Sequence, residues 1–185
     1  MARGPLVILS GPSGAGKSTV IQRLLESADL PLRCAVSATT RERRDYEVDG
    51  RHYHFWDRDS FCRHRDAGDL LEFAEVHGQL YGTPCSEVEP YREKGVGVVL
   101  VIDVQGFDQV RTKCGDLVSI FLEAPDYETR LRLRGEAEER IRRRLRTAEA
   151  ELPRAAEYMY RVINDDLETA VSDVRRIIQS HFPGR

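Results

Sequence analysis

The stretch Gly11-Pro-Ser-Gly-Ala-Gly-Lys-Ser18 decides the fold of this chain. It fits the pattern G-x-x-x-x-G-K-[ST], in which glycines let the backbone turn its N–H groups inward toward phosphate oxygens. An apolar, β-rich run precedes it at residues 6–9, and residues 19–26 follow with Val20 and Leu24 on one helical face. A strand, a glycine-rich loop and a helix in this order predict a phosphate-binding loop. The alternative is a glycine-rich turn with a surface lysine.

Two side chains of this loop have roles that the pattern itself implies. Lys17 has the length to reach the outer phosphates of a nucleotide, and the Ser18 hydroxyl is a ligand for Mg²⁺. The helix that starts here adds unpaired N–H groups and the positive end of its dipole. The sequence therefore predicts a phosphate site built from the loop and the first turn of the helix.

Length and composition indicate one globular domain with room for an insertion. The chain has 185 residues, 41% of them hydrophobic, and a formal net charge of −3, which argues against a general nucleic-acid binder. No apolar run approaches the roughly 20 residues of a membrane span, and the N-terminus enters the first strand without room for a signal peptide. The four cysteines form no C-x-x-C pair and read as reduced thiols. We therefore expect a cytoplasmic protein that binds neither membranes nor nucleic acids.

Predicted strands and helices alternate on either side of an irregular polar segment. The run 96–103 is almost continuously apolar and β-branched, as in a parallel strand buried on both faces. Asp49-Gly50 predicts a turn within the polar segment, and Pro153 is expected to kink or end a long helix. The other strands are expected at 32–37, 51–56, 70–76, 81–84, 117–122 and 161–164, and the other helices at 59–67, 87–94, 106–113, 126–133, 138–158 and 167–179.

This order predicts an α/β fold of the P-loop NTPase type, with three layers, α/β/α, around a central parallel sheet. A small mixed α/β insertion is expected at residues 38–90, so that the core comprises 1–37 and 91–185, and a helical lid is expected at about 134–150. Ligands of such sheets bind at the carboxyl ends of the strands. Asp103 closes the most hydrophobic strand at this edge, where it either helps to hold Mg²⁺ or caps the next helix.

The insertion carries an unusual set of polar side chains. Arginines with tyrosine hydroxyls form a natural phosphate clamp. Guanine has N–H donors at N1 and N2 and an acceptor at O6, so one carboxylate can accept from both donors while a hydroxyl donates to O6. Adenine, with an acceptor at N1, would leave the carboxylate unpaired, and sites built on this contrast discriminate by roughly 10⁴-fold or more. The set comprises Ser37, Arg41, Arg43, Arg44, Tyr53, Glu72, Tyr81 and Thr83, for which a solvated surface is the alternative reading.

Several longer motifs resemble guanylate kinases. They are Gly11 to Thr19, Ser37-Ala-Thr-Thr-Arg41, Glu47-Val-Asp-Gly-Arg-His-Tyr-His-Phe55, Leu71-Glu-Phe-Ala-Glu-Val-His-Gly-Gln-Leu-Tyr-Gly-Thr83, Ile102-Asp-Val-Gln-Gly106 and Val162-Ile-Asn-Asp-Asp166. The resemblance is collinear and spans nearly the whole chain. It implies a nucleoside monophosphate kinase that transfers a phosphoryl group from ATP to GMP, giving ADP and GDP, with Mg²⁺.

The resemblance also implies roles for individual residues. The guanine readers would be Ser37, Glu72 and Thr83, and the ligands of the GMP phosphate would be Arg41, Arg44, Tyr53 and Tyr81. Asp103 would lie near GMP and, with Ser18, would hold Mg²⁺ directly or through water. ATP would be bound by Gly11, Pro12, Ser13, Gly14, Ala15, Gly16, Lys17, Ser18, Thr19 and Asn164. Catalysis would rest on Lys17, Arg41, Arg134 and Arg144.

Two segments depart from the pattern of the family. The usual Pro-Gly turn after the second clamp arginine is replaced by Arg44-Asp-Tyr-Glu47, which makes Arg43 an alternative clamp residue, and the lid segment 134–140 is about one residue short. Two other functions stay open: a non-catalytic binding module, which would have a degraded phosphate loop, and a kinase of another small phosphorylated acceptor, which would lack Glu72 and Thr83. A less favoured zinc site would use His52, His54, Cys62 and His64.

Overall fold

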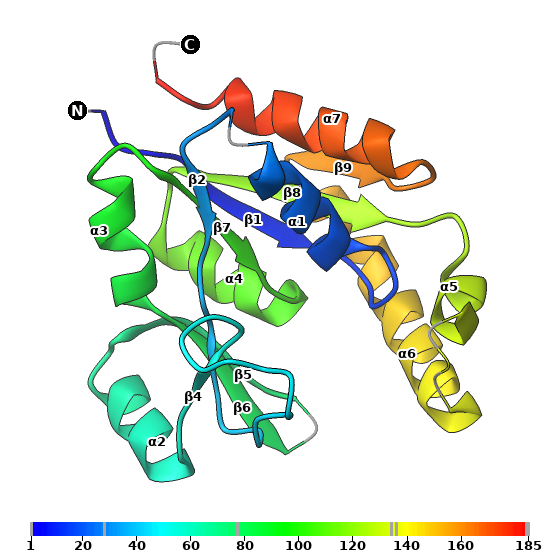
Figure 1. Cartoon of the computed structure of the whole chain (residues 1–185), viewed down its shortest axis with the longest axis horizontal. Coiled ribbons are helices and arrows are strands. Elements are labelled where there is room, and N and C mark those ends of the chain that lie inside the picture. The colour runs from blue at the N-terminus through cyan, green and yellow to red at the C-terminus, as the bar shows by residue number, and fades with distance from the viewer. Residues whose placement is uncertain (1, 28, 77, 134, 136, 184–185) are drawn as a thin grey trace.

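A five-stranded parallel sheet forms the core of the molecule (Figure 1). The computed structural model describes residues 2–27, 29–76, 78–133, 135 and 137–183. The strand order is β2-β7-β1-β8-β9, and each neighbouring pair is parallel. The bounds are β1 Leu6–Ser10, β2 Leu32–Cys34, β7 Gly97–Val101, β8 Leu117–Glu123 and β9 Tyr160–Ile163. The strand that leads into the phosphate-binding loop, β1, therefore lies at the centre of the sheet.

Helices cover both faces of this sheet, which confirms the predicted three layers. On one face, α1 (Lys17–Glu26) and α7 (Leu167–Gln179) pack against alternate side chains of β1. On the other face, α4 (Val104–Lys113) inserts Phe107 and Val110 among the remaining β1 side chains. Successive residues of a strand point to opposite faces, so a strand buried on both faces must be apolar throughout.

A second, four-stranded sheet forms the insertion. Its strand order is β4-β3-β6-β5, with β3 parallel to β4 and the other pairs antiparallel. The strand expected at 32–37 is divided: it leaves the core sheet at Cys34, and residues 35–37 cross to the second sheet. The elements are β3 Ala38–Thr39, β4 His54–Phe55, α2 Arg58–Asp66, β5 Leu70–Val76 and β6 Gln79–Pro84, followed by η1 Cys85–Glu87 and α3 Glu89–Arg92, which lead back to β7.

The strand expected at 51–56 is shorter in the structure. Only His54–Phe55 joins the sheet, and a side chain bonds to the edge of this short strand that faces away from β3. The backbone N–H of Phe55 donates to Asp49 Oδ1 at 2.8 Å. The predicted turn at Asp49-Gly50 is present, and Gly50 has a φ of 71°, which glycine adopts without strain.

Two helices project from the core beyond β8 (Figure 1). They are α5 (Tyr127–Leu133) and α6 (Glu138–Glu151), and α6 continues into the short helix η2 (Leu152–Glu157). Pro153 lies at the start of η2, which confirms that it ends the long helix. Arg134, one of the expected catalytic residues, lies outside the described residues. No helix in the described part of the chain combines the length and apolar character of a membrane span.

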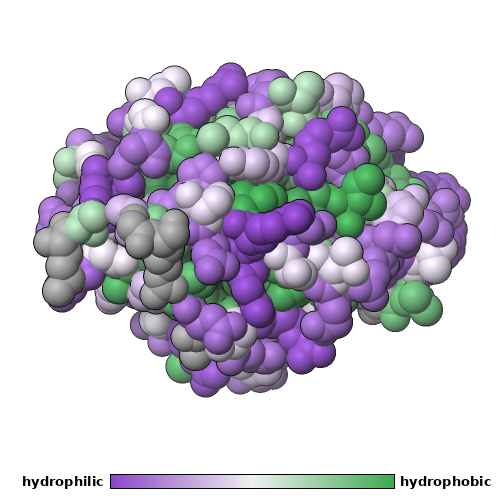
Figure 2. All heavy atoms as spheres, turned by 90° about the horizontal axis from the view of Figure 1, so that it is seen from above, coloured by the Kyte–Doolittle hydropathy of each residue, from purple (hydrophilic) through white to green (hydrophobic). Residues whose placement is uncertain are grey.

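Figure 2 views the molecule from the side on which α7 lies and shows a mainly hydrophilic surface. Hydrophobic side chains are visible in smaller areas between the hydrophilic ones. This distribution agrees with a chain in which 32% of the residues are charged and the apolar side chains gather in the two faces of the core sheet.

Candidate active site

A cavity of about 200 Å³, here called the insertion cavity, lies between the second sheet and the carboxyl end of β7. Five of the residues expected to bind GMP line it. They are Ser37, Tyr53, Glu72, Tyr81 and Asp103. Segments that are far apart in the sequence therefore meet where the fold class predicts a ligand.

The three expected guanine readers form one hydrogen-bonded chain. Glu72 on β5 pairs with Thr83 on β6, and only 5% of Glu72 is exposed. Thr83 Oγ1 donates to Glu72 Oε1 at 2.6 Å, and Ser37 Oγ lies 3.2 Å from Thr83 Oγ1. A Cβ atom at Gly106 would lie 2.9 Å from Glu72 Oε2, so α4 approaches the carboxyl this closely because residue 106 is glycine.

Burial raises the pKa of Glu72 to about 7. The hydrogen bond from Thr83 opposes this effect, and the negative charge of Asp103 adds to it. Near neutral pH the carboxyl group is therefore divided between its neutral and ionised forms. A ligand that offers N–H donors would favour the ionised form, because a carboxylate accepts hydrogen bonds with all its lone pairs.

Glu72 gives the free energy of unfolding a specific pH dependence. Its pKa rises from 4.5 to about 7 on folding, so its stabilising contribution is fully present below pH 4.5 and is lost as the pH rises through 7. At about 1.36 kcal/mol per pH unit, the wild type should lose roughly 2–3 kcal/mol of unfolding free energy relative to Glu72→Gln between pH 5 and pH 8. Urea unfolding of the two proteins across this range measures the difference. A difference that does not vary with pH would contradict the raised pKa.

Arg41 lies beside the tyrosines of the insertion cavity and is held by Glu47. Its Nη2 and Nη1 atoms lie 2.7 and 3.1 Å from the two carboxylate oxygens of Glu47. Its guanidinium carbon lies 5.7 Å from the centre of the Tyr53 ring. The Arg41 guanidinium holds the pKa of Glu47 at about 2. The carboxylate of Glu47 thus pairs with the arginine that is expected to bind phosphate.

The other two clamp arginines point elsewhere. The exposed Arg44 donates from Nη1 to Tyr46 Oη at 2.7 Å, and Arg43 donates from Nη1 to the Glu47 carbonyl at 2.7 Å. The Arg44–Tyr46 bond lies within the segment that departs from the family pattern, and Arg43 bonds to the last residue of that segment. Arg41 lies next to the cavity tyrosines Tyr53 and Tyr81, and the charge of Arg44 also reaches Tyr53.

The phosphate-binding loop has the backbone that its glycines predict. Gly11, Gly14 and Gly16 have φ values of 141°, 97° and 96°, in the region that favours glycine. A Cβ atom at Gly11 would lie 2.0 Å from the carbonyl oxygen of Leu122, a backbone atom that cannot move aside. The loop is therefore packed tightly onto the end of β8 while it turns into α1.

Lys17 and Arg144 converge on this loop from different elements. Lys17 Nζ donates to the carbonyl of Gly11 and, at 3.1 Å, to that of Pro12. Arg144 on α6 donates from Nη1 to Ser13 Oγ at 2.6 Å. The helix expected to serve as a lid therefore contacts the phosphate-binding loop through Arg144.

A second cavity, of about 290 Å³ and here called the loop cavity, borders the other side of the loop. Gly14, Gly16, Thr19 and Asn164 line it, which brings together residues expected to bind ATP. Asn164 Nδ2 donates to the Ala15 carbonyl at 2.7 Å. Arg130 on α5 also lines this cavity and donates to the Asn164 carbonyl. The sequence did not point to Arg130, because no motif distinguishes it from the other arginines of this segment.

Ser18 and Asp103 offer oxygen atoms that suit Mg²⁺. Ser18 is exposed in the first turn of α1, and Asp103 follows β7, the neighbour of β1. Asp103 Oδ1 accepts from the N–H groups of Gln105 and Gly106 at 3.0 and 2.9 Å, so the expected helix cap is present. Oδ2 makes no hydrogen bond among the described residues. A hydroxyl and a carboxylate that leave room for water and phosphate oxygens fit the octahedral preference of Mg²⁺.

The zinc alternative finds no support in the described ranges, where no three His, Cys, Asp or Glu side chains come together as metal ligands. Two of its histidines pair with carboxylates instead. His54 Nε2 lies 3.0 Å from Glu87 Oε1, and His64 Nδ1 lies 2.9 Å from Asp69 Oδ2. Each of these imidazoles is therefore held by a carboxylate rather than by a shared metal ion.

A phosphate-binding loop at the centre of a parallel sheet, with a polar cavity under an insertion at the same sheet edge, defines a P-loop kinase of small phosphorylated acceptors. The family model described as guanylate kinase matches residues 3–181. This chain belongs to the guanylate kinase family.

Individual relatives support this assignment. The chain is 46% identical to a guanylate kinase of Rubrobacter xylanophilus over 191 residues, which cover 99% of this chain and 100% of the relative. It is 47% identical to a guanylate kinase of a Chelativorans species over 183 residues, with 96% and 84% of the two chains covered. The crystal structure of guanylate kinase from Anaplasma phagocytophilum superimposes with a TM-score of 0.81 at 33% identity, covering 99% of this chain and 88% of that one. The resemblance and the fold class predicted from the sequence are confirmed.

Proposed function

We propose that this protein transfers the γ-phosphoryl group of ATP to GMP, giving ADP and GDP. The observation that carries this proposal is Glu72, a buried carboxyl group bonded to Thr83 and facing a cavity at the same sheet edge as the phosphate-binding loop. Once ionised, Glu72 accepts from guanine N1 and N2, while the hydroxyls of Thr83 and Ser37 serve O6. Adenine would place an acceptor against the carboxylate, so AMP is rejected.

The phosphate of GMP is assigned to the tyrosines and arginines beside the insertion cavity. Tyr53 and Tyr81 line the cavity, and Arg41 lies against them. A dianionic phosphate would compete with Glu47 for the Arg41 guanidinium, since phosphate and carboxylate both accept two parallel hydrogen bonds from arginine. Arg44 belongs to the same proposed set, which requires its exposed side chain to leave Tyr46.

ATP is assigned to the phosphate-binding loop and the loop cavity. The backbone N–H groups of residues 11–18 and Lys17 would hold the phosphates, and Asn164 with Arg130 would border the base. Arg144, together with Arg134, would face the transferring phosphoryl group and stabilise its charge. A phosphate oxygen of GMP attacks in line, so positioning and charge neutralisation suffice and no strong general base is needed.

Mg²⁺ is assigned to Ser18 and, directly or through water, to Asp103. When bound, this ion neutralises the charge that develops on the phosphate oxygens during transfer. The Ser18 hydroxyl, in the first turn of α1, and the Asp103 carboxylate, after β7, would be the protein oxygens that hold it. The insertion at 38–90 and the lid at about 134–150 are proposed to close over both nucleotides and exclude water. The four free thiols support a reducing compartment such as the cytoplasm.

Coupled ADP release with ATP, Mg²⁺ and each of GMP, AMP, CMP and UMP tests the proposal. We expect turnover with GMP at least about 10³-fold above that with AMP, because the buried carboxylate opposes adenine N1. Tight ATP binding without turnover of any of the four would favour the non-catalytic module. Turnover of a different phosphorylated acceptor at a comparable rate would overturn the assignment of Glu72 as base reader.

A further inference from the structure

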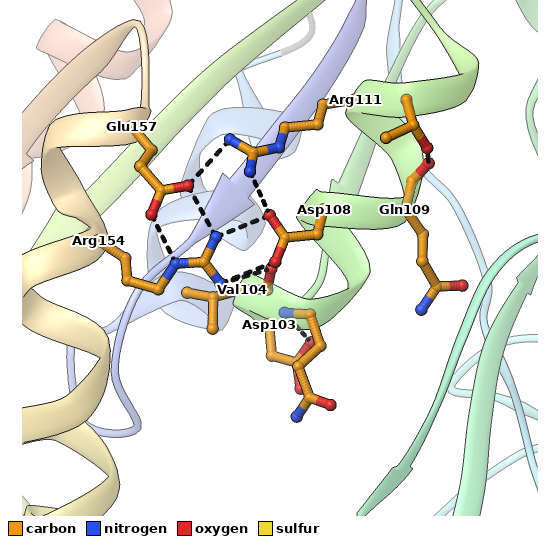
Figure 3. A network of polar contacts seen from close by, with 9 residues as sticks. Asp103, Val104, Asp108, Gln109, Arg111, Arg154 and Glu157 are labelled. Carbon is orange, nitrogen blue, oxygen red and sulfur yellow. Dashed lines mark hydrogen bonds and ion pairs between the residues drawn. The ribbon is translucent and has the colours of Figure 1, made fainter.

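Ion pairs join one side of helix α4 to the short helix η2. Asp108 and Arg111 of α4 form a closed ring of ion pairs with Arg154 and Glu157 of η2 (Figure 3). The Nη1 and Nη2 atoms of Arg154 lie 2.9 and 2.7 Å from the two carboxylate oxygens of Asp108, a bidentate pair. Gln109 lies on the other side of α4, away from this ring (Figure 3). The ion pairs therefore hold α4 in place, and with it the side chain of Gln109.

Gln109 binds both backbone groups of Phe73 on β5, the strand that carries Glu72. Its Nε2 donates to the Phe73 carbonyl at 2.6 Å, and the Phe73 N–H donates to its Oε1 at 3.1 Å. Because β5 is the last strand of its sheet, one edge of it lacks a strand partner. The amide of Gln109 takes the place of that partner at this one residue.

Lys113 lies one turn further along α4 and holds the residues on the other side of Glu72. Its Nζ donates to the carbonyl of Leu71 at 2.6 Å and to that of Leu70 at 3.3 Å. Both carbonyls can face one ammonium group because the pairing of β5 with β6 shifts register between Leu70 and Glu72. Irregularities of this kind bend a strand and redirect its side chains.

Glu72 thus lies between two points of β5 that α4 fixes. Alternate residues of an antiparallel strand direct their backbone groups to opposite edges. Leu71 and Phe73 face α4, whereas Glu72 pairs with Thr83 on β6. The described residues that line the insertion cavity do not include Gln109 or Lys113. The effect of Gln109 on a ligand in that cavity therefore passes through the backbone that carries Glu72. Lys113 acts through the same backbone and also through its positive charge, which lowers the pKa of the Glu72 carboxyl.

We propose that Gln109 and Lys113 are positioning residues for base selection, which fix β5 so that the Glu72 oxygens meet guanine N1 and N2. This inference rests on the proposed function. A displacement of about 1 Å at a reacting or recognising group costs up to about 10²-fold in rate. The two side chains therefore determine how strongly the protein discriminates between GMP and IMP, which lacks the 2-amino group.

The test compares Gln109→Met with the wild type, since methionine keeps the length of the side chain and removes both hydrogen bonds. We expect kcat/KM for GMP to fall about 10- to 100-fold, the GMP-to-IMP ratio to fall at least about 5-fold and the KM for ATP to stay within about twofold. Lys113→Met should act in the same direction, and Lys113→Arg should retain most of the wild-type ratio. Gln179→Met, which removes an exposed amide from α7, is the matched control and should change none of these values.

A double-mutant cycle with Glu72→Gln shows whether Gln109 acts through Glu72. In the Glu72→Gln background, Gln109→Met should lower kcat/KM for GMP by less than about twofold. Equal losses in both backgrounds, or a lower Tm with an unchanged GMP-to-IMP ratio, would mean a merely structural role and overturn the inference. Wild-type protein that turns over no GMP would overturn the proposed function and the inference together.

Discussion

Glu72→Gln should lose nearly all activity toward GMP while its ATP site stays intact. The amide presents an N–H donor where the carboxylate accepts, and it can accept from guanine through one oxygen only. We expect kcat/KM for GMP to fall by about 10³-fold or more, because a buried polar group would face an unmatched base edge. Coupled ADP-release kinetics measure this loss, and titration with a non-hydrolysable ATP analogue should give an affinity within about twofold of wild type.

Glu75→Gln is the matched control for this variant. Glu75 lies on the same strand but is exposed, so the same substitution there should leave GMP turnover unchanged. Folded Glu72→Gln protein that loses ATP binding and GMP turnover equally would remove Glu72 from base reading. The same variant should be more stable than the wild type at pH 8, because it no longer buries an ionised carboxylate. The variant would then be less active but more stable, a trade-off that is common at functional sites.

Lys17→Met should lower kcat by about 10²- to 10³-fold, because the ammonium group would no longer neutralise charge on the transferring phosphoryl group. The Lys17 ammonium group donates to the Gly11 and Pro12 carbonyls of the loop. A nucleotide phosphate would replace these carbonyls as its partner. Methionine keeps most of the length of the side chain and removes only the charge and the donors. Single-turnover kinetics with ATP and GMP measure the chemical step directly.

Lys94→Met is the control for the loss of a lysine. Lys94 is exposed between α3 and β7, so its removal should leave kcat unchanged. The affinity of Lys17→Met for GMP should match that of the wild type, because Lys17 is assigned to ATP alone. A kcat within about threefold of wild type would contradict a role for Lys17 in stabilising the transition state.

The core of the fold could be predicted because its signals are local. The uninterrupted apolar run 96–103 contains β7, the helix expected at 167–179 is α7, and Pro153 ends α6. The insertion was harder to predict, because β3 and β4 contain two residues each and carry no periodicity. Their pairing depends on side chains such as Asp49 that bond to the backbone, and on partners far away in the sequence.

The candidate site could be predicted as a set of residues but not as a set of contacts. Ser37, Glu72 and Thr83 do form one hydrogen-bonded chain, whereas their roles toward GMP stay predictions. The pairing of Arg41 with Glu47 joins two loop residues, to which no helical or strand spacing applies. Gln109 and Lys113 are four residues apart and so share one face of α4, but the packing of α4 against β5 decides what that face meets.

The strand order of the core sheet also has a consequence for how the chain folds during synthesis. Strands β1 and β2 are not neighbours in the sheet, because β7 lies between them. The first residue of β7 is Gly97. At translation rates of about 5–20 residues per second, the apolar strand β1 waits on the order of 5–20 s before its first partner exists. During that interval it is an unpaired hydrophobic segment that invites aggregation or chaperone binding. A nascent chain that stops before β7 therefore cannot assemble the sheet that supports the phosphate-binding loop.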